Sequence, residues 1–308
     1  MKTSLHSILT AGAALLLFFL SAPVRADILY LSSFDTNTIW RFTSDGVGSV
    51  FARSGLNGPS GLAFDSAGNL YVANILGNII EKFSPDGVGS VFANTGLSNP
   101  TGLAFDSAGN LYAANNSIST IEKFSPDGVG SVFATTITNR PTGLAFDSAG
   151  NLYVSDIHAG TIEKITPDAV GTPFASNVSD PFGLAFDSAG NLYAANQHSG
   201  TIEKFTPGGV GSVFASGVNF PRGLAFDSAG NLFVTTLGTT TVEKFTPDGV
   251  GSVFANSGLS VPTFLAFTDD FGVPLKLANQ VPEPTTWALL ALPALLGIFR
   301  HRRSTGCT

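Results

Sequence analysis

Residues 61–74 read GLAFDSAGNLYVAN, and residues 80–93 continue with IEKFSPDGVGSVFA. This phrase returns along the chain at intervals of 40 or 41 residues. The first phenylalanine of the phrase marks each copy, at Phe64, Phe105, Phe146, Phe186, Phe226 and, in a degenerate copy, Phe267. A period of this length, made of short apolar runs and Gly-Asn turns, is typical of a β-propeller, whose blades bury a shared core.

Each copy predicts four antiparallel strands. GLAF and NLYVAN are apolar runs of strand length, joined by a turn in which Gly68 takes a positive φ and Asp65 caps the reversal. IEKF predicts a third strand. The turn SPDGVG then leads into GSVFA, which is the fourth and outermost strand of the blade.

The chain is expected to begin and end inside the same blade. The second-strand pattern occurs six times, first at Leu29, and the LAF pattern also occurs six times, last at Leu265. Pairing residues 264–267 with residues 28–33 would close a ring of six four-stranded blades without a free inner edge. Residues 274–280 (PLKLANQ) could compete for that place, but we favour the N-terminal strand because it continues into complete third and fourth strands. The predicted fold class is therefore all-β, a six-bladed β-propeller of antiparallel blades.

Residues 1–26 have the features of a secretory signal peptide. Lys2 supplies the positive start, residues 11–20 form an apolar core, and Ala26 ends a small-residue cleavage point. The apolar core is too short for a permanent membrane helix, which is the alternative interpretation. We expect export of the following domain, residues 27–280.

Residues 281–308 contain, in order, a Pro-Glu-Pro motif, an apolar stretch and a basic tail. These are Pro282, Glu283 and Pro284, then residues 287–299, then residues 300–303. The order resembles the PEP-CTERM sorting signal of Gram-negative bacteria. The resemblance implies passage through the secretion translocon, cleavage by an exosortase-type protease, and a place in the cell envelope or outside the cell. A short transmembrane helix with a basic cytoplasmic tail would attach the chain transiently, and a simple lasting anchor is the alternative.

The composition of residues 27–280 argues against nucleic-acid binding and against disulfide or thiolate chemistry. Ten basic and twenty-one acidic side chains give this segment a formal charge of −11, which argues against nucleic acid as a partner. The single cysteine, Cys307, lies in the tail, so the domain has neither disulfides nor thiolate chemistry.

The repeat pattern P-x-G-L-A-F-D, G-N-L-Y-V-A-N/D and I-x-K-F resembles the NHL family over residues 28–267. It is also similar to the related gluconolactonase and streptogramin-lyase propellers. The resemblance implies the fold and leaves the activity open, because binders, scaffolds and enzymes share this architecture.

Two of the four loops in each copy vary, and the other two hardly change. The DSAGN and SPDG turns are nearly constant, whereas the loops before the inner strand and after the second strand change freely. Antiparallel alternation places both variable loops on one face of the disc, around the channel, where we expect recognition; unconstrained drift is the alternative. One sector of that face gathers titratable residues and forms our candidate ligand-binding site, with ordinary solvated loop residues as the alternative reading. Its members are Arg140, Asp156, His158, Asp180, His198 and Arg222.

The resemblance to gluconolactonases implies one divalent metal held over the channel by Glu, Asn and Asp. Asp156 matches the family's Asp-bearing strand end, but Thr142, Phe182 or Arg222 replaces the Asn of its P-N-G motif. No glutamate lies in an entry loop, and the glutamates of the IEKF segments are expected to form surface pairs with the lysines that follow them. They are Glu81, Glu122, Glu163, Glu203 and Glu243.

We therefore expect no catalytic residues, no bound metal and no cofactor. The expected role is that of an exported binding or structural module for exopolysaccharide or an envelope protein. The alternative is a metal-dependent lactonase- or lyase-like enzyme, with Ca²⁺ near Asp156 and a base such as His158 or His198.

Overall fold

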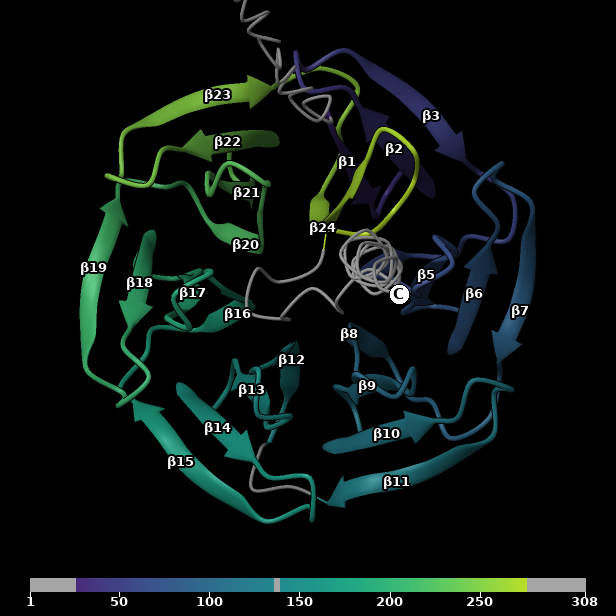
Figure 1. The fold of residues 1–308 in the computed structure, drawn as a ribbon, viewed down its shortest axis with the longest axis horizontal. Coiled ribbons are helices and arrows are strands. Elements are labelled where there is room, and N and C mark those ends of the chain that lie inside the picture. The colour runs from purple at the N-terminus through teal and green to yellow at the C-terminus, as the bar shows by residue number, and fades with distance from the viewer. Residues whose placement is uncertain (1–25, 136–138, 276–308) are drawn as a thin grey trace, which may run out of the picture.

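The computed structural model describes residues 26–135 and 139–275, which form a closed ring of six blades (Figure 1). Each blade is an antiparallel sheet of four strands, as the repeat predicts. The described residues contain no helix, and thus none that could cross a membrane. The predicted signal peptide, the Pro-Glu-Pro motif and the apolar stretch after it lie outside the described residues.

The strands fall into four sets from the channel outward. The innermost strands are β24 (Pro262–Asp269), β4 (Pro59–Phe64), β8 (Pro100–Phe105), β12 (Pro141–Phe146), β16 (Pro181–Phe186) and β20 (Pro221–Phe226), which we assign in this order to blades 1 to 6. The second strands are β1 (Asp27–Ser33), β5 (Leu70–Asn74), β9 (Leu111–Asn115), β13 (Leu152–Asp156), β17 (Leu192–Asn196) and β21 (Leu232–Thr236). The third strands are β2 (Thr38–Phe42), β6 (Ile79–Phe83), β10 (Thr120–Phe124), β14 (Thr161–Ile165), β18 (Thr201–Phe205) and β22 (Thr241–Phe245). The outermost strands are β3 (Gly48–Ala52), β7 (Gly89–Ala93), β11 (Gly130–Thr135), β15 (Gly171–Ser176), β19 (Gly211–Ser216) and β23 (Gly251–Ala255).

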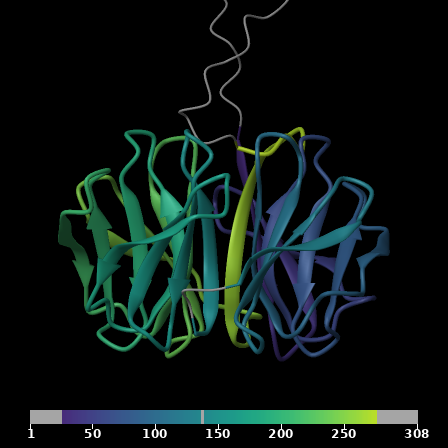
Figure 2. The same cartoon turned by 90° about the horizontal axis from the view of Figure 1, so that it is seen from below.

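The two ends of the described chain share blade 1, which confirms the predicted closure. β24 pairs antiparallel with β1 (Figure 2). In this pairing Leu31 lies opposite Leu265. The competing segment starts at Pro274, which forms only an isolated bridge with Thr268. The N-terminal strand takes the place because its own hydrogen bonds to β2 fix it within a complete sheet.

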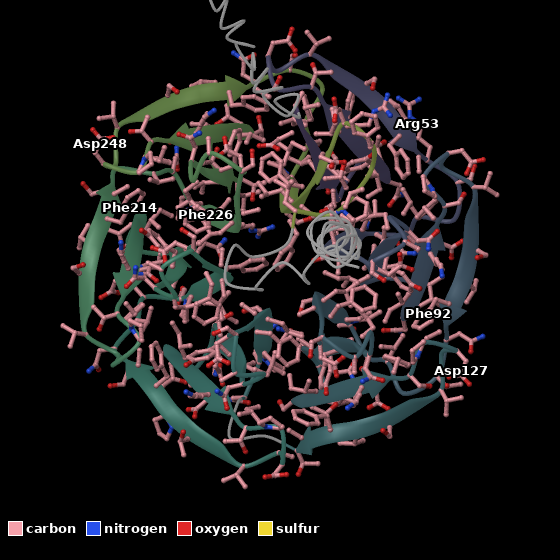
Figure 3. All side chains as sticks on the ribbon, viewed as in Figure 1. Arg53, Phe92, Asp127, Phe214, Phe226 and Asp248 are labelled. Carbon is pink, nitrogen blue, oxygen red and sulfur yellow. The ribbon has the colours of Figure 1, made fainter. Side chains whose placement is uncertain are left out.

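An aromatic wedge repeated six times holds the blades together. Tyr71 of blade 2 meets Phe92 of its own outer strand and Phe105 of blade 3, with ring centroids 4.8 and 5.0 Å apart and edge-to-face geometry. The corresponding rings in the other blades are Tyr30, Tyr112, Tyr153, Tyr193 and Phe233. Figure 3 shows the ring filled by side chains, with Phe214 and Phe226 labelled in the wedge between blades 5 and 6. Each such pair contributes about 0.5–1.5 kcal/mol beyond its buried area. The repeating phenylalanines of the sequence therefore stabilise the packing of neighbouring blades.

Glycine lets neighbouring inner strands approach one another. At each of five equivalent positions, an added Cβ would lie 2.1–2.5 Å from a carbonyl oxygen of the next blade. The five positions are Gly61, Gly102, Gly143, Gly183 and Gly223. Blade 1 has Phe264 there instead, in a bulge of β24 opposite Ser32.

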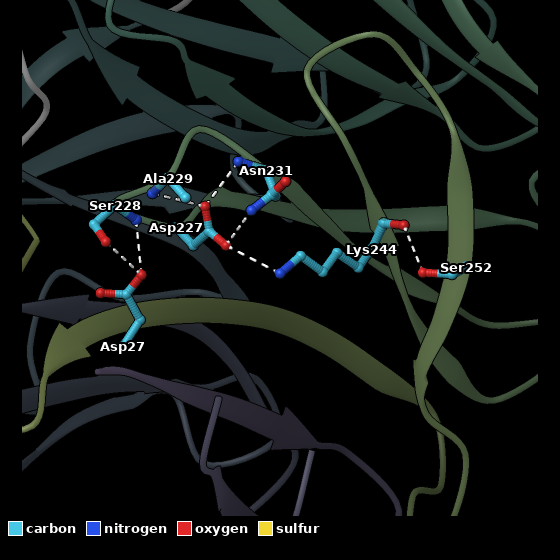
Figure 4. Close-up of polar contacts among 7 residues, drawn as sticks. All are labelled: Asp27, Asp227, Ser228, Ala229, Asn231, Lys244 and Ser252. Atoms are coloured by element: carbon cyan, nitrogen blue, oxygen red, sulfur yellow. Dashed lines mark hydrogen bonds and ion pairs between the residues drawn. The ribbon is translucent and has the colours of Figure 1, made fainter. Parts of the chain in front are cut away.

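The constant turns lie on the face of the disc opposite the variable loops. Asp227 accepts hydrogen bonds from the backbone of Ala229 and Asn231 at 3.0 and 2.7 Å, and its other oxygen lies 3.4 Å from Nζ of Lys244 (Figure 4). Gly230 has a φ of 81° in this turn. The same arrangement surrounds the aspartates of blades 2 to 5, which confirms the predicted capping role of the aspartate.

The prediction that the IEKF glutamates form surface pairs is wrong. Glu81, Glu122 and Glu163 are each 5% exposed, and burial raises the pKa of each. Lys82 instead lies 3.5 Å from Asp65. Successive residues of a strand point to opposite faces, and neighbouring blades cover both faces here, so a Glu and the Lys after it cannot pair.

Candidate functional site

Both variable loops of each blade lie on one face, as predicted, and hydrogen bonds join them. In blade 2, the backbone N–H of Ile75 donates to the carbonyl of Gly58 at 2.9 Å. Asn74 ends the second strand, accepts a hydrogen bond from the N–H of Asn57 at 3.1 Å, and donates to the carbonyl of Gly55 at 2.9 Å. The last residue of the second strand therefore fastens the two loops together.

Asp156 occupies this fastening position in blade 4. It is fully buried, and its carboxylate accepts hydrogen bonds from the backbone N–H groups of Asn139, His158 and Ala159. All three donors belong to the two loops, so the carboxylate fastens the loops together. Its charge also adds to burial in raising the pKa of Glu163.

The exposed members of the predicted site form no hydrogen bonds or ion pairs with one another in the described part of the chain. Arg140 donates from Nε and Nη2 to Oδ1 of Asn116, both at 3.2 Å, and His158 has its Nδ1 3.1 Å from Nδ2 of Asn139. Asp180 and His198 are exposed loop residues. Within residues 26–135 and 139–275, the only hydrogen bond or ion pair between any two of the six members is the one that the backbone of His158 donates to Asp156. The structure thus places these residues on one face without joining them into one constellation.

Arg222 differs from the other five because it lies on an inner strand, as the second residue of β20. Its guanidinium carbon is 5.1 Å from the ring centroid of Phe182, the second residue of β16. The ring of Phe182 in turn lies 5.4 Å from that of Phe264 on β24. Because β20 lies between β16 and β24 in the ring (Figure 1), the contact between the two phenylalanines spans the width of one blade. We call Phe182, Arg222 and Phe264 the channel cluster.

The channel cluster replaces a structural contact of the other blades. In three blades the second residue of the inner strand is a threonine whose hydroxyl donates to a proline carbonyl of the next inner strand. These bonds join Thr101 to Pro141 at 3.1 Å, Thr142 to Pro181 at 3.2 Å and Thr263 to Pro59 at 3.2 Å. Blades 5 and 6 have Phe182 and Arg222 at this position and lack the hydroxyl.

The charge of Arg222 has no counter-ion in the described part of the chain. Burial lowers the pKa of its guanidinium, and its Nε is buried without a hydrogen-bond partner. No carboxylate of the described residues forms an ion pair with it. A half-buried cation of this kind provides a ready partner for an anion that enters from outside.

A cavity lies closer to the constant turns than the channel cluster does. It has a volume of about 1030 Å³, and its walls are the leucines and alanines of the inner strands, among them Leu62, Leu184 and Leu224. Its rim consists of turn residues such as Asp187 and Ser228. The cavity therefore belongs to the half of the channel nearest the constant turns, whereas we expected an opening between the variable loops.

The residues that the structure describes include no group of three His, Cys, Asp or Glu side chains that could hold a metal ion. Asp156, the ligand that the gluconolactonase resemblance implies, already accepts three backbone hydrogen bonds. The described residues near Asp156 therefore fit a divalent metal poorly.

Residues 280–303, outside the described residues, match the model of the PEP-CTERM protein-sorting motif. The motif indicates an exported protein that an exosortase recognises and processes. No curated protein matches this sequence.

Solved structures match the fold of the chain. A chain of the nidogen/laminin complex has a TM-score of 0.72 and 21% identity, with 78% of this chain and 98% of that chain covered. Virginiamycin B lyase from Staphylococcus aureus has a TM-score of 0.59 and 16% identity, with 79% and 82% covered. A gluconolactonase from Xanthomonas campestris has a TM-score of 0.58 and 21% identity, with 68% and 82% covered. These neighbours share the propeller fold, which the NHL-like repeat predicted, and at such identities the likeness concerns the fold alone.

Proposed function

We propose that this protein is a non-enzymatic binding module of the cell envelope or the extracellular matrix, and that its ligand is a polysaccharide. In this proposal residues 1–26 direct export through the translocon. An exosortase-type protease then recognises the motif at residues 282–284 and removes the C-terminal helix, which until then holds the chain in the membrane.

The channel cluster is the observation that carries the binding role. The six blades repeat one another closely, yet three consecutive blades depart from the repeat where Phe182, Arg222 and Phe264 meet. A purely structural spacer would need no such departure, since the threonines of blades 1, 3 and 4 already join neighbouring inner strands. We therefore assign recognition to the mouth of the channel on the variable-loop face.

A glycan array probed with the processed protein, purified from the exporting cell, tests this function. Binding to one class of polysaccharide is the expected result. A protein that binds no glycan but retains an envelope protein in a pull-down would contradict the polysaccharide assignment. Fractionation of cells that carry the full chain or a chain lacking residues 281–303 tests the processing step, and equal release of both chains would contradict it.

An envelope protein as ligand, and a metal-dependent lactonase or lyase with Ca²⁺ near Asp156, are the alternatives. The buried and fully engaged carboxylate of Asp156 speaks against the enzyme. Calorimetric titration with Ca²⁺ decides this point, with Asp156→Ala as the variant and Asp156→Asn as the matched control, which keeps the shape of the side chain. Stoichiometric binding that both substitutions abolish would favour the enzyme over the binding module.

A further inference from the structure

We propose that the channel cluster is a subsite for the carboxylate of an acidic saccharide, so that the ligand is a polysaccharide containing uronic acid. The guanidinium of Arg222 pairs with the carboxylate, and the rings of Phe182 and Phe264 contact the apolar face of the sugar. This inference rests on the proposed function and names its ligand class.

The arrangement of the departures argues for a single site. Phe182 and Arg222 replace hydroxyl residues in adjacent blades, and Phe264 replaces a glycine in the next blade. Substitutions scattered at random over six blades would not be expected to meet. These three are in mutual reach, with distances of 5.1 and 5.4 Å linking Arg222 to Phe182 and Phe182 to Phe264.

Phe264 is informative because its position otherwise excludes any side chain. In the other five blades a Cβ at this place would lie within 2.5 Å of a carbonyl oxygen of the next blade. β24 accommodates the ring in a bulge, where the N–H of Phe264 donates to the hydroxyl of Ser32 at 3.0 Å. Blade 1 thus departs from the close packing of the other inner strands, and the result is an aromatic ring that contacts Phe182, two blades away.

The electrostatics of Arg222 select an anion with two oxygens. Its Nε is buried without a partner, and burial lowers the pKa of the guanidinium, so the charged form lacks stabilisation in the free protein. A carboxylate can accept from two guanidinium nitrogens at the same time, which is the bidentate geometry that arginine favours over lysine. The stacking of the guanidinium on Phe182 keeps the fork in place before the ligand arrives.

The aromatic rings distinguish a sugar acid from a small inorganic anion. Phe264 and Arg222 are half-buried and retain exposed surface, and Phe182, which is only 8% exposed, lies in contact with both. A pyranose ring has an apolar C–H face that packs against such rings by dispersion and loss of hydrated surface. Phosphate or sulfate would gain the charge contact alone. The net negative charge of residues 27–280 offers no general attraction for polyanions, so this contact must be local.

Calorimetric titration of the processed protein with tetragalacturonate and with its fully methyl-esterified form tests the inference. The ester keeps the sugar and removes the charge. We expect the acid to bind at least tenfold more tightly than the ester, and R222Q to lose this preference. R222K should retain part of it, because the charge remains while the bidentate fork is lost. F182L should weaken acid and ester alike, because it removes the ring and leaves the charge.

Arg53→Gln is the matched control, since Arg53 is an exposed arginine at the rim of the disc (Figure 3). It should bind as the unchanged protein does, and every variant should show a single cooperative melting transition, which shows that it is folded. Equal affinity for acid and ester, or an unchanged preference in R222Q, would overturn the subsite. Binding of a neutral glycan that R222Q retains would overturn the subsite and leave the proposed function intact. Binding of oligoglutamate in place of any saccharide would overturn both.

Discussion

Replacing Gly143 by alanine tests how closely the inner strands approach one another. The added Cβ would lie 2.2 Å from the carbonyl oxygen of Phe182, 3.0 Å from Oγ of Ser155 and 3.1 Å from the backbone nitrogen of Leu184. Two of these atoms belong to the backbone of blade 5, so no rotamer change relieves the overlap. Blades 4 and 5 must move apart by about 1 Å to restore ordinary contact distances.

Overpacking of this kind costs about 3 kcal/mol, and for a domain of this size each kcal/mol lowers the melting temperature by about 2–4 °C. Gly143→Ala should therefore melt about 6–12 °C lower in a differential scanning calorimeter. Two further glycines separate the causes. Gly109 has a φ of 82° and no neighbour within 4 Å, so Gly109→Ala adds only backbone strain and costs about 1 kcal/mol. Gly77 has neither a positive φ nor a close neighbour, since the nearest atom would lie 3.5 Å from an added Cβ. Gly77→Ala should therefore change the free energy of unfolding by less than about 0.5 kcal/mol. If Gly143→Ala melted at the same temperature as Gly77→Ala, the close approach of the blades would be refuted.

Three further substitutions probe charge and packing. The raised pKa of Glu163 means that its charge opposes folding above that pKa, so Glu163→Gln should raise the free energy of unfolding by about 1 kcal/mol at pH 8 and by nothing below pH 4.5, in urea titrations at both pH values. Although burial raises the pKa of Asp187, the hydrogen bonds from Asn191 and the charge of Lys204 hold this pKa below its ordinary value of 3.8. The contribution of the Asp187 carboxylate to stability is therefore complete near neutral pH and is lost as the pH falls through the lowered pKa. Asp187→Asn should be less stable than the unchanged protein at pH 7 and should approach its stability by pH 2. Tyr193→Leu removes two edge-to-face ring contacts at 5.1 and 5.0 Å and should cost about 2–3 kcal/mol by chemical denaturation, whereas a loss below about 0.5 kcal/mol would contradict the aromatic wedge.

Much of the fold follows from the sequence because the repeat is an internal alignment. The constant phenylalanine at Phe64 and its copies predicted the blades, and the positions of Leu29 and Leu265 predicted the shared closing blade. Both inferences use only strand pairing and the need to avoid a free edge. The burial of the glutamates was not predicted, because adjacent Glu and Lys suggest an ion pair. Alternation along a strand instead sends the side chains of Glu81 and Lys82 to opposite faces.

The site was harder to predict, because loop residues that share a face need not touch. His158 and His198 hold equivalent places in adjacent blades, yet the structure shows no hydrogen bond or ion pair between them in the described part of the chain. Asp156 matched a family motif, but its three backbone donors make it a loop fastener. Phe264 was not predicted as a site residue, although the sequence distinguishes it, because it occupies the position where the other copies have glycine. Only the curvature of the ring brings it to Phe182, which lies two blades away.

A crystal structure of the processed protein with bound tetragalacturonate tests the central claim most directly. We predict a carboxylate within hydrogen-bonding distance of the guanidinium of Arg222, with a sugar ring against Phe182 or Phe264 on the variable-loop side of the channel. A saccharide bound in the cavity of about 1030 Å³ near the constant turns, or on a loop away from Arg222, would contradict it.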